Sequence, residues 1–114
     1  MLFRSLANTV DNSGLIAQVN AGTLQLGTAS SSGIHAIGGN STVNTGGTLQ
    51  LGGSGGDQIF NSVTVNMAGG TFDEGGLDEQ FATLAGYGSV ANTGTMTLGN
   101  GISLSTSGTL AVTR

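Results

Sequence analysis

The sequence predicts an all-β fold, a right-handed single-stranded parallel β-helix (β-solenoid) of about four turns, each of roughly 24 residues. The first observation is a repeated phrase, because Val19–Gly27 reads VNAGTLQLG and returns at Val43–Gly52 as VNTGGTLQLG. Looser copies follow at 65–72 and 90–99, and the Gly-Thr step recurs at Thr23, Thr48, Thr71 and Thr95. Such a period is typical of solenoids, whose units bury an apolar face by stacking. The right-handed coil follows from the general preference of parallel crossovers.

The second observation is that apolar and polar residues alternate within each unit. Leu24 and Leu26 are separated by one polar residue, as are Leu49 and Leu51, which is the period of a strand with one buried face. Twenty-two glycines interrupt every window that is long enough for a helix. The composition therefore disfavours helix and favours short strands joined by turns.

Each unit is predicted to contain three short arms, and each arm is expected to pair with its equivalent one turn above and below. The first arm is placed at 34–37, 58–60 and 81–84, the second at 41–43, 62–65 and 89–90, and the third at the Thr-Leu-Gln-Leu segment and its counterparts. This alignment predicts one column of inward side chains formed by Leu24, Leu49, Phe72 and Met96.

The corner between the second and third arms carries Asn and Gly in the first three copies of the phrase. Both residue types tolerate a positive φ, so a tight turn is favourable there. Asn20, Asn44 and Asn66 hold equivalent places in the phrase, and we expect their side chains to stack as an amide ladder.

Three regions are predicted along the chain. Residues 1–14 form an N-terminal lead-in or partial turn, 15–99 contain the solenoid repeats, and 100–114 form a truncated turn or a hairpin, because the Gly-Thr step after Thr95 returns at Thr109, well short of a full unit. Residues 1–14 contain no apolar run of seven or more, so they predict neither a signal peptide nor a membrane anchor. The apolar core is small for the backbone that must be ordered, so we expect stacking on neighbouring turns of a longer solenoid or end to end on a second copy.

The charge pattern narrows the classes of partner. The chain has no lysine, its two arginines are Arg4 and Arg114, and its net charge is −4. Phosphate backbones and anionic lipids require clustered cations, so nucleic-acid binding and direct membrane insertion are not expected. The absence of cysteine excludes a disulfide framework, a thiolate metal site and a cysteine nucleophile.

The phrases Val19–Gly27 and Gly70–Val90 resemble the autotransporter-associated β-strand repeats in passenger regions of type V secreted bacterial proteins. The resemblance covers about residues 15–99. It implies a right-handed β-helix that is displayed at, or released from, the bacterial cell surface, on the extracellular side of an outer-membrane barrel. One residue departs from the repeat pattern, because Glu74 stands in the column of Leu26, Leu51 and Leu98. Since burying an unpaired carboxylate is costly, we expect Glu74 to turn outward, with Leu77 or Phe81 filling the vacated space.

An acidic cluster and a glycine-rich run that contains Asp57 are candidate sites. Asp57, Asp73, Glu74, Asp78 and Glu79 are five of the six carboxylates, and paired carboxylates can serve as glycosidase acid and base or as calcium ligands. The competing interpretation, which we favour, is a solvated loop. The run Gly52–Phe60 matches the calcium-binding nonapeptide of toxin-type β-rolls, but such sites need tandem copies and there is one copy here. A glycine-rich corner that leads into the 58–60 arm is the favoured reading.

Two single residues complete the set of candidates. His35 is the only histidine, and it has no second ligand or nucleophile that a motif places beside it, so it is interpreted as an ordinary arm residue. Tyr87 lies between two glycines and could stack on a sugar ring, although packing within a turn is the simpler interpretation. We therefore assign no catalytic, cofactor-binding or metal-binding residue.

The sequence leaves three hypotheses for function. The favoured one is a non-enzymatic structural repeat module, a stalk or spacer in an exported cell-surface protein. The alternative is an adhesin-like surface that binds glycans or host proteins through its outward Thr, Asn and Gln side chains. The remote alternative is a polysaccharide-active β-helix enzyme of the pectate-lyase kind, which would need a basic side chain near bound calcium to abstract a proton. No internal Lys or Arg is present to take that role.

Overall fold

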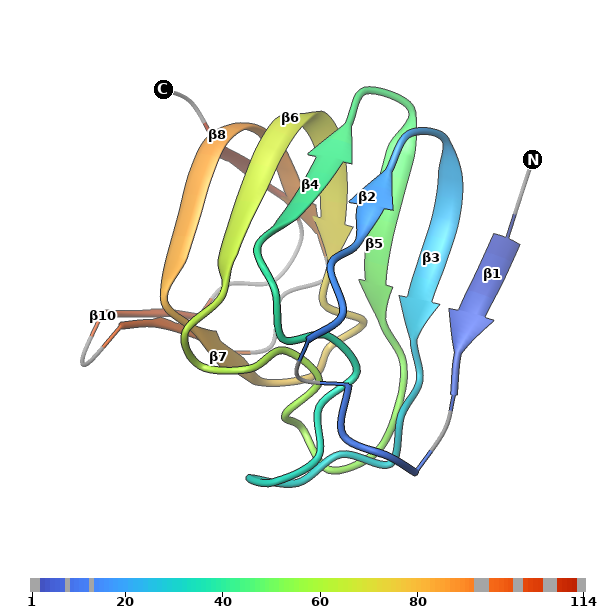
Figure 1. The fold of residues 1–114 in the computed structure, drawn as a ribbon. Helices are drawn as coiled ribbons and strands as arrows, with labels where there is room; N and C mark the ends of the chain where they lie inside the picture. The colour runs from blue at the N-terminus through green and yellow to red at the C-terminus, as the bar shows by residue number, and fades with distance from the viewer. Residues whose placement is uncertain are drawn as a thin grey trace.

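The computed structural model describes residues 3–7, 9–12, 14–91, 95–99, 102–105 and 109–112. These residues form strands and turns and contain no helix. Parallel strands lie one turn above another as a β-solenoid of about four turns, with β1 at one end of the stack and β8 at the other (Figure 1). The predicted all-β parallel solenoid is thus confirmed.

The strands divide into those of the second arm, those of the third arm and two long strands that contain both. The second arm contains β2 (Gln18–Val19) and β4 (Ser41–Asn44), the third contains β1 (Phe3–Leu6), β3 (Gly22–Leu26) and β5 (Gly47–Leu51), and both continue through β6 (Thr64–Asp73) and β8 (Thr83–Ala91). Each of these strands pairs in parallel with its equivalent in the next turn.

The remaining strands lie in the last part of the chain. They are β7 (Glu79–Phe81), which pairs in parallel with β9 (Thr95–Leu98), and the antiparallel strands β10 (Ile102–Ser105), paired with β9, and β11 (Thr109–Val112), paired with β8. The stack therefore changes from parallel to antiparallel pairing within its last turn.

The column of the third arm is confirmed for three of its four predicted members. Leu24 lies opposite Leu49, and Leu49 lies opposite Phe72. The next member is Val90 and not Met96, which lies opposite Glu79 in the pairing of β7 with β9. The prediction failed because it assumed a constant unit length, whereas the unit that ends at Val90 is shorter than the units before it.

The short fourth turn also corrects the predicted arms. Leu84 lies opposite Val65 in the second arm rather than the first, and the Ser89–Val90 pair lies in the third arm rather than the second. One residue, Ala82, separates β7 from β8, so the second arm begins directly after the first. In the preceding turn, the second arm begins at Thr64 and not at Ser62, with Val65 opposite Ser41.

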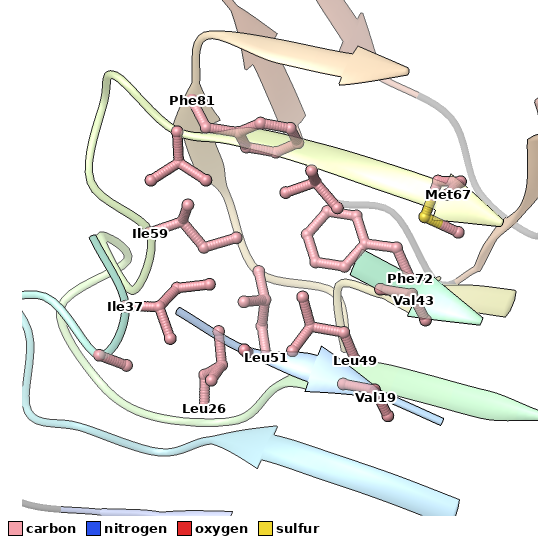
Figure 2. Close-up of a cluster of buried hydrophobic side chains, with 14 of the residues drawn as sticks. Val19, Leu26, Ile37, Val43, Leu49, Leu51, Ile59, Met67, Phe72 and Phe81 are labelled. Atoms are coloured by element: carbon pink, nitrogen blue, oxygen red, sulfur yellow. The ribbon is translucent and has the colours of Figure 1, made fainter. Parts of the chain in front are cut away.

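The core lies between the arms and consists of inward side chains in columns (Figure 2). Leu26 stacks on Leu51, Val19 on Val43 and Val43 on Met67. An edge-to-face contact joins the rings of Phe72 and Phe81, whose centroids are 5.7 Å apart. All of these side chains are almost fully buried, so alternation within the arms supplies the hydrophobic stabilisation.

Polar side chains form ladders on the outside of the stack. Asn44 donates from Nδ2 to Oδ1 of Asn20 over 2.8 Å, as the predicted amide ladder requires. Asn66 is not its third member, because Asn66 lies opposite Thr42, and Asn44 faces both Ala68 and Gly69 across a register shift. A second ladder runs from Gln25 to Gln50 and from Gln50 to Asp73, with bonds of 3.1 and 3.0 Å.

Glycine allows the backbone of one turn to approach the next at the last corner. Gly86 has a φ of 90°, and an added Cβ would overlap the carbonyl oxygen of Met67. Any other residue would clash with that carbonyl and strain the backbone. Glycine at this corner therefore makes the close stacking of the two turns possible.

Candidate functional site

Three ionisable side chains stack in one column beside the first arm. His35, which is 2% exposed, lies between Asp11 of the preceding turn and Asp57 of the next. Its Nδ1 is 3.1 Å from Oδ1 of Asp11, and the same oxygen accepts the backbone N–H of His35 over 2.9 Å. Its Nε2 is 3.5 Å from Oδ2 of Asp57, and its ring meets Phe60 edge to face at 4.9 Å. In this histidine column the imidazole is buried, both carboxylates are partly exposed, and the three side chains link successive turns.

Gln58 directs its side chain into the interior next to the histidine column. Its Oε1 accepts the backbone N–H of Thr28, and its Nε2 donates to the carbonyl oxygen of Thr28 and to Oγ of Ser30. Ser30 in turn accepts the N–H of Asp57 over 3.0 Å. The corner that leads into the first arm is therefore filled by polar side chains that satisfy one another and the backbone.

Glu79 begins β7 and points back toward the preceding turn, where it is 3% exposed. Its Oε2 accepts the N–H of Gln58 over 2.8 Å, and its Oε1 accepts the N–H of Ile59 over 3.2 Å and that of Gln80 over 3.3 Å. The carboxylate thus takes the place of strand carbonyls for Gln58 and Ile59. Burial raises the pKa of Glu79 to about 8, with these N–H groups opposing the rise and the charge of Asp57 adding to it.

Glu74 follows β6, and its side chain points inward, so the predicted outward orientation is wrong. Asp73 lies opposite Gln50, so Glu74 stands one turn from Leu51, and its side chain is 0% exposed. Among the described residues, neither of its carboxylate oxygens has a hydrogen-bond partner. Burial raises the pKa of Glu74 to about 7, and the nearby charge of Asp78 contributes. The side chain keeps its inward place because a neutral carboxyl group is far easier to bury than a charged one.

The remaining sequence candidates do not gather into one site. Asp73 belongs to the outward ladder and also accepts the N–H of Gly75 over 2.9 Å, while Asp78 is exposed. The run Gly52–Phe60 forms bends before a short bridge of Ile59 with Ile37, and its Asp57 faces His35. Tyr87 lies in β8 rather than in a turn and is 40% exposed.

Shallow pockets lie at the surface of the described part of the chain. One of about 310 Å³ is lined by Gly56, Asp78, Glu79, Gln80 and Thr97, and another of about 360 Å³ lies between Arg4 of β1 and residues 18–24. In the part of the chain that the structure describes, no three His, Asp or Glu side chains are grouped to hold a metal ion. Arg114 lies outside the described residues.

The sequence interpretation missed the histidine column and the inward role of Gln58 and Glu79. A signal was present, because Asp11 and His35 are 24 positions apart and Asp57 follows His35 after about one further turn. The repeated phrase covers the second and third arms, whereas Asp11, His35 and Asp57 lie outside it, so their spacing was not compared.

The ionisable side chains of this region can bind protons and hold the backbone of adjacent turns in place, but they point into the interior. His35 and Glu79 are almost fully buried and already engaged by their neighbours. Burial also raises the pKa of Asp57, and the adjacent His35 opposes that rise. The pKa values of Asp57, Glu74 and Glu79 are all raised, so the stability of the later turns depends on the protonation of these three carboxyl groups.

Comparisons with protein-family models, with curated proteins and with solved structures give no match to this chain. The resemblance to autotransporter-associated repeats is thus carried by the sequence phrases alone. No helix among the described residues has the length and apolar character needed to cross a membrane.

Proposed function

We propose that the chain is a non-enzymatic structural repeat module, a stalk or spacer in the passenger region of an exported bacterial cell-surface protein. The observation that carries the proposal is the continuous register of the stack, in which Arg4, Leu24, Leu49, Phe72 and Val90 follow one another along the third arm. Each turn of such a stack contacts its neighbours alone, so the number of turns sets the length of the module.

The edges of the stack support the same role. Strands β1 and β2 are the two ends of the hydrogen-bonded path that contains β1 to β6. An edge strand offers its N–H and C=O groups to a further strand. Both edges lie in the first turns, whereas β8 at the other end pairs with the antiparallel strand β11. In the proposed role, a neighbouring turn of a longer solenoid, or a second copy, pairs with β1 and β2.

The buried polar groups also favour a structural role. Gln58 and Glu79 bond to the backbone of adjacent turns, and His35 is held between two carboxylates. These contacts fix the first arm where its strand pairing is short. A catalytic acid or base must instead reach the proton of a substrate.

The alternative function, recognition of glycans, would use the outward polar side chains. The ladder of Gln25, Gln50 and Asp73 is one such set. Its amide and carboxylate groups bond to each other, which leaves fewer donors for a sugar hydroxyl. This observation ranks the spacer above the glycan-binding surface.

The spacer is tested by lengthening the chain by one turn. In the test variant, residues 25–49 are duplicated after Leu49, and the full chain is displayed between an outer-membrane anchor and a terminal epitope. We expect the urea midpoint to be kept, the particle measured by X-ray scattering to lengthen by roughly 4.8 Å, and the epitope to stay accessible.

The matched control inserts the same segment with its residues in scrambled order, which should lower the urea midpoint and the level of display. A glycan array supplies the opposing result. Binding to a defined sugar that disappears in a folded Gln50→Ala variant would replace the spacer by the glycan-binding surface.

A further inference from the structure

Glu74 and Glu79 are two buried glutamates that differ in what meets their charge. Three backbone N–H groups donate to Glu79, from Gln58, Ile59 and Gln80. No donor among the described residues reaches either oxygen of Glu74. The charge of an ionised Glu79 is therefore met in part by these N–H groups, although burial still raises its pKa to about 8, whereas ionisation of Glu74 leaves a charge with no donor beside it.

The backbone beside Glu74 is suited to movement. Gly75 and Gly76 follow it with φ values of 61° and 77°, and both are exposed. Hydrogen bonds between described residues hold the segment, among them Glu74 N–H to the carbonyl of Ala91, Leu77 N–H to the carbonyl of Glu74, and Gly75 N–H to Asp73. Two consecutive glycines are a hinge on which the side chain of Glu74 can leave the interior without unfolding the arms on either side.

We propose that residues 74–78 form a proton-operated latch, which is closed while Glu74 is neutral and swings outward when Glu74 ionises. In the closed latch Glu74 is buried one turn from Leu51, and Leu77 packs partly buried against the core. The open latch exchanges those contacts for hydration of the carboxylate. The stack then keeps its first turns and loosens at one corner.

The charge of Asp78 opposes ionisation of Glu74 inside the closed latch. Asp78 lies on the segment itself and repels an ionised Glu74, and it is the group whose charge adds to the raised pKa of Glu74. Asp73 precedes the hinge and bonds to Gln50 and to Gly75 N–H. Beyond the latch lies Glu79, which faces Asp57, and Asp57 faces His35. None of the described groups near Glu74 is a cation that would hold its carboxylate inside.

The sign of the pH dependence follows from the direction of the shift. The folded pKa of Glu74, about 7, lies above its ordinary value of 4.5. The closed form is therefore fully favoured below about pH 4.5 and is lost as the pH rises through 7. Acidification closes the latch and mild alkali opens it.

Amide hydrogen exchange at pH 5.5 and 8.5, corrected for the intrinsic exchange rate, tests the latch in the full chain. We expect the protection of the Glu74 and Leu77 amides to fall at least tenfold at pH 8.5 relative to the amides of β4 and β5. Glu74→Leu and Glu74→Gln should remove this relative change. Asp78→Asn should lower the pKa of Glu74 and reduce the loss of protection, because a charge that repels the closed, ionised carboxylate has been removed.

The wild-type protein also provides a direct readout, so the proposal does not depend on a variant that folds. The carboxyl carbon of Glu74, followed by NMR, should titrate near pH 7 together with the loss of protection at Leu77. Titration at an ordinary glutamate pKa, or an unchanged pH dependence in Glu74→Leu, would overturn the latch.

Discussion

The earlier and later turns of the solenoid use the same phrase but fill their interiors differently. The steps from Leu24 to Leu49 and from Leu49 to Phe72 are nearly equal in length, and there the buried side chains are apolar groups, hydroxyls, the amide of Gln58 and the ring of His35, with amide ladders outside. The step from Phe72 to Val90 is clearly shorter, and the adjoining interior contains Glu74 and Glu79. Where the unit is shortened, carboxyl groups stand in places that leucine or backbone carbonyls occupy elsewhere. The difference shows that a repeat can lose residues when side chains replace the missing pairing.

The largest expected effect comes from truncating the aromatic side chain at the junction of the two regions. Phe72→Ala removes the contact with Phe81 and leaves a cavity in the core, so it should lower the free energy of unfolding by about 3–5 kcal/mol. Leu24→Ala, at a partly buried place in the same column, is the matched control and should cost less. Urea unfolding measures both. Equal losses would mean that the later turns contribute no more than the end of the stack.

A smaller effect is expected from the carboxylate that replaces strand pairing. Glu79→Ala leaves the N–H groups of Gln58 and Ile59 without their acceptor, at about 1–3 kcal/mol for each buried donor. Glu79→Gln keeps one acceptor and should lose less at pH 5. Urea midpoints of the two variants at that pH decide the order, and the reverse order would contradict the role assigned to Glu79.

The same residue also predicts a pH dependence of stability. Because the folded pKa of Glu79 is about 8, against an ordinary value of 4.5, its contribution is complete below about pH 4.5 and is lost as the pH rises through 8. The wild-type urea midpoint should therefore fall between pH 5 and 9, and the fall should be smaller in Glu79→Gln. A midpoint that rises with pH would show that the N–H groups outweigh burial.

The outward amide ladder of the earlier turns should matter less than the buried groups of the later turns. Asn44→Ala removes one hydrogen bond at the surface, where water replaces the lost partner, so a loss of about 0.5 kcal/mol is expected. Thermal unfolding of this variant beside Thr45→Ala, which loses a bond to the carbonyl of Ala68, gives the comparison. A loss above about 2 kcal/mol, more than a typical hydrogen bond contributes, would show that the ladder is a principal source of stability.

No effect is expected from calcium. The carboxylates of the later turns are directed to Gln50, to backbone N–H groups or to the interior. Among the described residues, no three His, Asp or Glu side chains are grouped so that they could hold a metal ion. Millimolar calcium should therefore leave the melting temperature unchanged, because only binding to the native state raises it. A rise of several degrees that is absent in Asp57→Ala would show a calcium site near the glycine run.

The repeat phrase was sufficient to predict the parallel stack and the register of Leu24 with Leu49 and Phe72. It failed at Met96 because periodicity fixes a register only while the unit length is constant, and the later turn is shorter. It failed at Glu74 because the rule against buried charge holds for the ionised form, and burial itself favours the neutral form. Asn66 was misplaced because the strands pair Thr42 with Asn66 and Val43 with Met67, and a register shift at Asn44 follows. The repeated phrase alone does not indicate this register.

The candidate site was less predictable than the fold. His35, Asp11 and Asp57 are each separated by two strands and their loops, and only their one-turn spacing links them in the sequence. The inward orientation of Gln58 depends on the small residues Gly53 and Ser30, which leave room for its amide. Such complementarity between a long polar side chain and small neighbours one turn away has no local sequence pattern.

The short reach of the strand pairing has a consequence for how the chain folds. Among the described strands, paired residues lie at most 25 positions apart, as Gln25 and Gln50 do. Each new turn therefore closes a loop of the same modest size, so the entropy lost per step does not grow with the length of the stack. Folding of this kind proceeds as a zipper, in which a completed turn is the template for the next. An extended chain can thus fold turn by turn from one end, before its remaining residues are available.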